Sequence, residues 1–250
     1  MDGKRLWEST GFHIACLIGC AAILLSVTWP QEWESIEALP CGSWLTFWSQ
    51  AMEGKLVICV LPACAVLPYS DAYLQEKKNG FLRSYICRRG RMEYVKSKMF
   101  VMGAAGFLSW VCAALLAGFL LFFCLFPGEM CMDTELFFSE SGDILLGTGL
   151  SILRTGLVGS IFGNLGAVCA QLAGSVYMAY GLPFVCYYML LILKERYFET
   201  MYFIYPAEWI SPAGDWGGSW YPGLWLFLIL LDLAFILLNG AMLWERVREL

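Results

Sequence analysis

The residues best suited to bind a metal ion lie in the first apolar segment of the chain. His13, Cys16 and Cys20 are spaced i, i+3 and i+7, so a helix would carry the three side chains on one face. Imidazole and thiolate groups are ligands for zinc and copper. Cysteine in an apolar run more often packs as a small hydrophobic side chain, and we therefore predict no metal site.

The sequence gives little support to hydrolytic or nucleotide chemistry. His13 is the only histidine, which disfavours a serine–histidine protease. Gly54-Lys55 lacks the preceding glycine loop, so it does not form a phosphate-binding motif. We expect no catalytic residue and no cofactor in this chain. If ATP and Mg²⁺ are used, they act on another subunit.

Four polar side chains inside apolar segments are the best candidates for a functional site. Asn164 and Gln171 are seven residues apart, and Asp232 and Asn239 repeat that spacing. A polar group in the membrane interior costs a few kcal/mol unless it is paired. Two roles are open: hydrogen bonds between helices, or the polar lining of a substrate path. We treat the four residues as substrate-path candidates.

Composition indicates the elements that must position these residues. The chain of 250 residues is 59% hydrophobic and only 15% charged, with a mean hydropathy of +0.64. A water-soluble domain of this length needs far more charge to cover its surface. We predict an all-α integral membrane protein, a single domain over 1–250. Its six transmembrane helices are expected at about 12–29, 56–70, 99–126, 149–169, 175–193 and 221–243.

The positions of Lys and Arg predict the orientation. Twelve of the 16 lie in segments 1–11, 71–98 and 244–250, which are therefore expected to be cytoplasmic, together with both termini. The remaining four (Lys55, Arg154, Lys194 and Arg196) are expected near outer helix ends, where their charges reach the interface. The predicted outer loop at 127–148 is acidic. Cys41 and Cys131 are expected to face outside.

The segment 71–98 has more order than an orientation signal requires. We predict a short helix from Asp71 to Gly80, capped by Ser70. Lys77 and Lys78 fall in its last turn, where positive charge is favourable, and Gly80 suits the left-handed position just beyond the end. Such a helix at the membrane surface, with exposed charge, would form a docking surface for a cytoplasmic partner.

This arrangement resembles the permease subunit of a bacterial, Gram-positive-like ABC-2 type (type V) ABC transporter. The likeness rests on the stretch from Leu61-Pro62 to Lys98, on Lys4 to Phe12 before the first span, and on Tyr205 to Trp209 before the last. It implies that Asp71 to Gly80 is a coupling helix in the groove of a separate ATPase. It also implies short re-entrant helices in the outer segment 197–221. The implied coupling residues are Asp71, Glu76, Lys77, Lys78, Gly80, Arg88 and Arg91.

The sequence thus predicts the membrane subunit of an ATP-driven exporter in the bacterial cytoplasmic membrane. Its cargo would be amphipathic, such as a peptide, an antibiotic or a lipid-like molecule. Expected partners are an ABC ATPase subunit, a second or related permease copy, and membrane lipids, but not nucleic acid. Two alternatives stay open: a membrane-embedded enzyme, and a membrane scaffold or receptor that transports nothing.

Overall fold

Helices make up nearly all of the part of the chain that the computed structural model describes. That part comprises residues 2–28, 39–40, 43–125, 129–130, 134–198, 201–218 and 220–249. The five longest helices are α2 (Thr10–Thr28), α7 (Arg91–Leu125), α8 (Thr134–Ala173), α9 (Val176–Arg196) and α11 (Pro222–Arg248). The shorter ones are α1 (Asp2–Trp7), α3 (Ser43–Met52), α4 (Lys55–Val66), α5 (Ala72–Lys78), α6 (Phe81–Arg89), the 3-10 helix η2 (Tyr202–Ile204) and α10 (Pro206–Ile210). In the described residues, strand pairing is limited to β1 (Leu39–Pro40), parallel to β2 (Glu129–Met130).

The helices support a multi-pass membrane protein with four to five candidate spans. Four are long and apolar enough to cross a membrane: α7, α8 over Gly142–Ala173, α9 and α11. Trp44–Met52 and Lys55–Val66 meet at 62° and together count as a fifth. The apolar helix Thr10–Ser26 is shorter than the spans. The all-α prediction is confirmed, whereas six complete spans are not.

Several boundaries differ from the prediction, among them the start of α7 at Arg91 rather than near 99. Residues 43–52, expected in a loop, form α3, because Trp48 packs inward and its indole N–H donates to the carbonyl of Ala114 (3.1 Å). Helix α8 begins at Thr134 rather than near 149, so much of the expected acidic loop is helical. Hydropathy identifies the apolar part of a helix, but the backbone helix continues through polar residues when no proline interrupts it. No proline occurs in α8.

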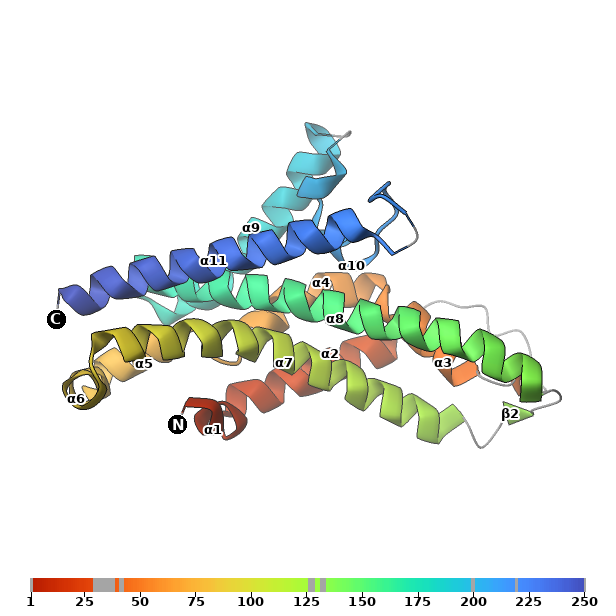
Figure 1. Cartoon of the computed structure of the whole chain (residues 1–250), viewed down its shortest axis with the longest axis horizontal. Coiled ribbons are helices and arrows are strands. Elements are labelled where there is room, and N and C mark those ends of the chain that lie inside the picture. The colour runs from red at the N-terminus through yellow and green to blue at the C-terminus, as the bar shows by residue number, and fades with distance from the viewer. Residues whose placement is uncertain are drawn as a thin grey trace.

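Helices α7, α8 and α11 run side by side along the long axis of the molecule (Figure 1). Glycines allow α7 and α8 to touch: a Cβ on Gly159 would lie 2.7 Å from the carbonyl oxygen of Gly106. Gly163, four residues further on, faces the carbonyl of Ala65 in α4. The GxxxG pair therefore packs α8 against two neighbouring helices, where close contact supplies the dispersion energy. Helix α9 diverges from the bundle toward its C-terminal end (Figure 1).

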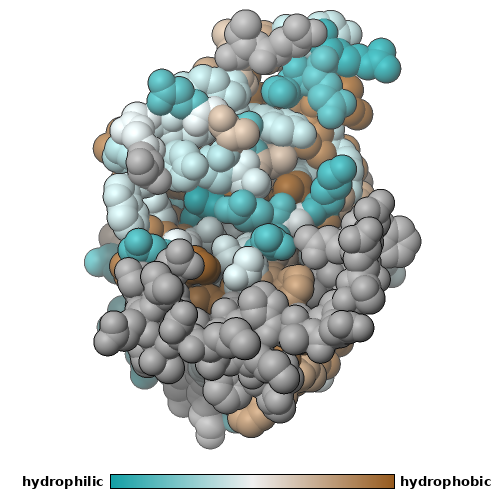
Figure 2. All heavy atoms as spheres, turned by 90° about the vertical axis from the view of Figure 1, so that its right-hand side faces the viewer, coloured by the Kyte–Doolittle hydropathy of each residue, from teal (hydrophilic) through white to brown (hydrophobic). Residues whose placement is uncertain are grey.

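The molecule has two distinct ends. At one end lie α1, α5, α6 and the end of α11 (Figure 1). We call it the basic end, since Lys77, Lys78, Arg88 and Arg89 are exposed there. A buried cluster that includes Leu6, Tyr73, Tyr94 and Val247 joins these elements. The opposite end, seen head-on in Figure 2, carries hydrophilic residues over much of its described surface. Polar ends on an apolar bundle are what a membrane-spanning protein requires.

Candidate functional site

The four polar residues predicted inside apolar segments form one hydrogen-bonded series between α8 and α11. Gln171 donates its side-chain N–H to the Asn239 oxygen (2.6 Å), and the amide of Asn239 donates to the Asn164 oxygen (3.1 Å). Asn164 donates to the backbone carbonyl of Ser160 (3.1 Å), whose hydroxyl donates to Asp232 Oδ1 (2.8 Å). We call this series the polar ladder.

The polar ladder has a buried part, whose residues bind each other, and a part that lines a cavity. Asn164, Gln171 and Asn239 are buried and bind each other, which is the interhelical role. Asp232 is only half-buried and lines a cavity of about 400 Å³ between α7, α8 and α11. Gly103 in α7 borders the same cavity, and a Cβ there would lie 3.0 Å from the Ser160 hydroxyl. The carboxylate end of the ladder is therefore accessible, and its amide end is structural.

A second buried polar cluster holds α5 against the rest of the basic end. Lys98 of α7 donates to Glu76 Oε1 (2.7 Å) and to the Tyr69 hydroxyl (2.8 Å). The Tyr94 hydroxyl donates to Glu76 Oε2 (2.9 Å), and Arg5 of α1 reaches Oε1 at 3.3 Å. Lys98 is completely buried. Charge-assisted bonds at this burial fix α5 to α7 and α1, and we call this group the Glu76 cluster.

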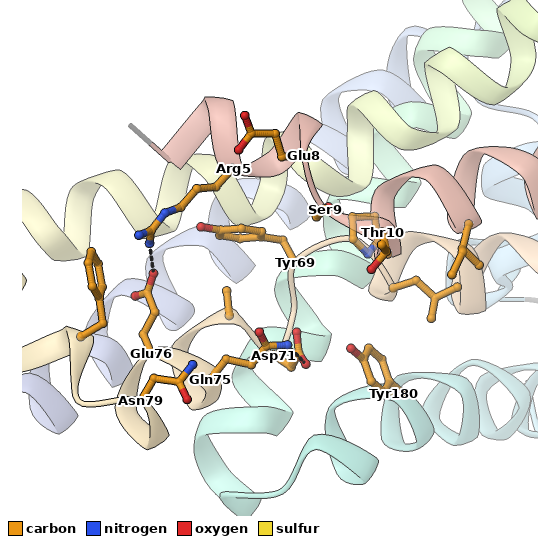
Figure 3. Close-up of a pocket in the computed structure, with 16 residues that line it drawn as sticks. Arg5, Glu8, Ser9, Thr10, Tyr69, Asp71, Gln75, Glu76, Asn79 and Tyr180 are labelled. Carbon is orange, nitrogen blue, oxygen red and sulfur yellow. Dashed lines mark hydrogen bonds and ion pairs between the residues drawn. The ribbon is translucent and has the colours of Figure 1, made fainter.

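A cavity of about 750 Å³ borders the Glu76 cluster. Figure 3 shows Arg5 reaching from α1 to Glu76 on α5, with Tyr180 of α9 on the other wall, near Asp71. The side chain of Gln75 donates to Asp71 (2.7 Å) across one helical turn. Helix α5 is thus anchored on one side and bordered by open space on another.

The structure divides the predicted coupling residues into two groups. Lys77, Lys78, Gly80, Arg88 and Arg91 are exposed, as a docking surface requires. Gly80 has φ 70°, the left-handed conformation expected just past the helix end.

Asp71 and Glu76 are buried, so the expectation of exposed charge is wrong for them. Burial is possible because Lys98 compensates the Glu76 charge. Ser70 does not cap α5, because its hydroxyl donates to the carbonyl of Gly163 (3.2 Å) and Asp71 occupies the N-cap position.

The sequence did not predict the partners of Glu76. The pattern placed Lys98 on one helix face with Arg91 and Tyr94 and among the cytoplasmic charges, but it assigned Lys98 no acidic partner. The signal that could have identified the site is the spacing of Tyr94 and Lys98, one helical turn apart at the start of a long span, where a lysine facing the protein needs an acid.

Arg154 is a further site residue, and α8 does not end near it as the prediction expected. It lies in the middle of α8, 4% exposed, and donates to the carbonyl of Ile210 (2.6 Å) at the end of α10. Glu53 lies 3.4 Å away. This arginine therefore ties the segment between α9 and α11 to the bundle.

The described part of that segment, where short re-entrant helices were expected, has little regular helix. It contains the single turn η2 and the five-residue α10. Trp209 and Trp216 are buried, while Tyr197 and Trp220 are largely exposed. The aromatic residues therefore serve both as packing against α11 and as an exposed belt.

Within the described ranges, no three His, Cys, Asp or Glu side chains lie close enough to hold a metal ion. Cys16 instead contacts the carbonyl of Ser109 through its sulfur (3.4 Å), and His13 is exposed. Cys41 and Cys131 lie outside the described residues.

Comparison with known proteins does not identify a family for this chain. No protein-family model, no curated protein and no solved structure matches the chain.

Proposed function

We propose that this chain is the membrane subunit of an ATP-driven exporter of the ABC-2 type, in a bacterial cytoplasmic membrane. A separate ATPase would dock on α5 and α6, and an amphipathic substrate would cross the membrane along the chain and a second permease copy. The observation that carries the proposal is the Glu76 cluster. It joins a short, charged surface helix rigidly to a long apolar helix, as a coupling element requires.

The contacts supply a mechanical route for the proposed coupling. A partner that contacts Lys77 and Lys78 would displace α5, and the bonds from Glu76 to Lys98 and Tyr94 (2.7 and 2.9 Å) would pass that displacement to α7. Helix α7 packs on α8 through its glycines, and α8 binds α11 through the polar ladder. Displacements pass between packed helices when rigid elements move together.

The proposal is tested by asking what co-purifies with the chain from its native membrane. We expect a subunit with nucleotide-binding motifs and ATPase activity. The Lys77→Glu/Lys78→Glu double variant should release it, because the partner must present acidic groups to these lysines. The matched control is Lys55→Glu/Arg196→Glu, two exposed basic residues that lie outside α5 and α6, which should retain the subunit.

Three outcomes separate the alternatives. Loss of the ATPase in the α5 variant alone supports the coupling role. Equal retention in both variants would mean that α5 is not the docking element. A chain that never retains an ATPase would contradict the exporter and favour a scaffold, a receptor or a membrane enzyme.

A further inference from the structure

The cavity beside Asp232 has the character of an amphiphile site. It is a groove of about 400 Å³ whose walls come from α7, α8 and α11. One face of α7 supplies apolar side chains, including Met99, Phe100 and Phe107. Phe100 is 77% exposed, so this wall is open to the surrounding lipid. Asp232 is the acidic side chain among the groove's lining residues.

Asp232 lies deep along α11. At about 1.5 Å per residue, it is about 15 Å from the start of the helix at Pro222. Lys96 lines the groove toward the basic end. Along α7 it is about 10 Å from Gly103, at the same rise of about 1.5 Å per residue. For a small soluble ion, transfer from water to this depth in an apolar environment is unfavourable. A molecule with an apolar tail can reach it from within the bilayer.

The carboxylate is incompletely compensated by the protein. Its hydrogen bonds come from the Ser160 hydroxyl (2.8 Å) and from the Asn164 side chain, which are neutral donors. Beyond Ser160 the polar ladder continues through neutral amides. Among the described residues, no Lys or Arg forms an ion pair with Asp232, although Glu76 and Glu53 each have one. An ionised carboxylate in an apolar setting is strongly favoured by a cationic partner.

We propose that the groove binds a cationic amphiphile, with its ammonium group on Asp232 and its alkyl chain along Phe100 and Phe107. Gly103 matters because a Cβ there would contact Asn164 and Ser160, the two side chains that donate hydrogen bonds to Asp232. The volume lies within the range of small-molecule sites, and the lipid-facing wall lets a longer chain extend into the bilayer. The inference that cationic amphiphiles are the exporter's substrates rests on the proposed function. The inference that they bind in this groove does not depend on that function.

Binding can be measured on the full chain in nanodiscs of zwitterionic lipid, without an ATPase. The probes are dodecyltrimethylammonium, dodecyl sulfate and dodecyl maltoside, which share the alkyl chain and differ in charge. We expect saturable binding of the ammonium probe alone, above the partitioning into empty nanodiscs. Asp232→Asn should weaken it at least tenfold, and Asp232→Glu should restore it to within about threefold. Glu245→Gln, an exposed acid on the same helix, should change nothing.

A second variant tests the groove independently, in case Asp232→Asn does not fold. Ala104→Leu narrows the groove without removing the acid, and it should also weaken the ammonium probe. Equal binding by Asp232→Asn and the parent, equal binding of the sulfate probe, or no saturable binding would overturn the proposal. If the ATPase still co-purifies in that case, the exporter function stands and only its substrate class is wrong.

Discussion

Removing the charge of Glu76 while keeping Lys98 should destabilise the folded chain by about 3–5 kcal/mol, the usual cost of breaking a buried ion pair from one side. The two side chains are 10% and 0% exposed, and their charged atoms are 2.7 Å apart. In Glu76→Gln the lysine ammonium would stay buried beside the Tyr69 hydroxyl and the glutamine oxygen, without the carboxylate that compensates its charge. The unpaired charge, rather than the lost hydrogen bond, dominates that cost.

A double-mutant cycle isolates the interaction energy between Glu76 and Lys98. Glu76→Gln combined with Lys98→Met leaves no unpaired buried charge, since Arg5 is exposed, and the glutamine oxygen can still accept from Tyr94. We expect the double variant to be more stable than Glu76→Gln alone, with a coupling energy of about 2–3 kcal/mol. Unfolding can be followed by tryptophan fluorescence during transfer from mild detergent into dodecyl sulfate.

The control is an exposed pair at the same end of the molecule. Arg246 and Glu249 lie 3.8 Å apart with side chains 39% and 70% exposed, so Glu249→Gln should cost less than about 1 kcal/mol. A coupling energy below about 0.5 kcal/mol for Glu76 and Lys98 would refute the argument that α5 is fixed to α7 by charge.

Three further predictions concern the bundle and its orientation. Gly159→Leu should destabilise the chain by about 2 kcal/mol or more through overpacking, whereas Gly149→Leu, where a Cβ would meet nothing within 4 Å, should be near neutral by the same unfolding assay. Arg154→Met should increase proteolysis in the segment between α9 and α11, since it removes the bond to α10; unchanged cleavage would exclude that role. On intact cells, an impermeant thiol reagent should label Cys41 but not Cys87 until the membrane is permeabilised; the reverse pattern would invert the predicted orientation.

The sequence determined those features that depend on neighbouring residues. Hydropathy located α7, α9 and α11, because the apolar surface of a span is a local property. Gly80 was predicted to be left-handed, and its φ of 70° confirms it, since a turn just past a helix end favours a residue without Cβ. The break between α8 and α9, predicted near 170–175, falls at Gly174 and Ser175.

Other features were decided only when distant segments met. Whether Glu76 is exposed depends on Lys98, which lies 22 residues away in another helix. Asn164 and Asn239, 75 residues apart, bind each other because α8 and α11 pack side by side, and the i, i+7 spacing predicted their faces but not their partners. The contacts of Arg154 were not predicted for the same reason, since one acceptor is a backbone carbonyl that carries no sequence signal. Periodicity along one helix cannot specify which polar group lies across from it, because that is set by the packing of whole helices.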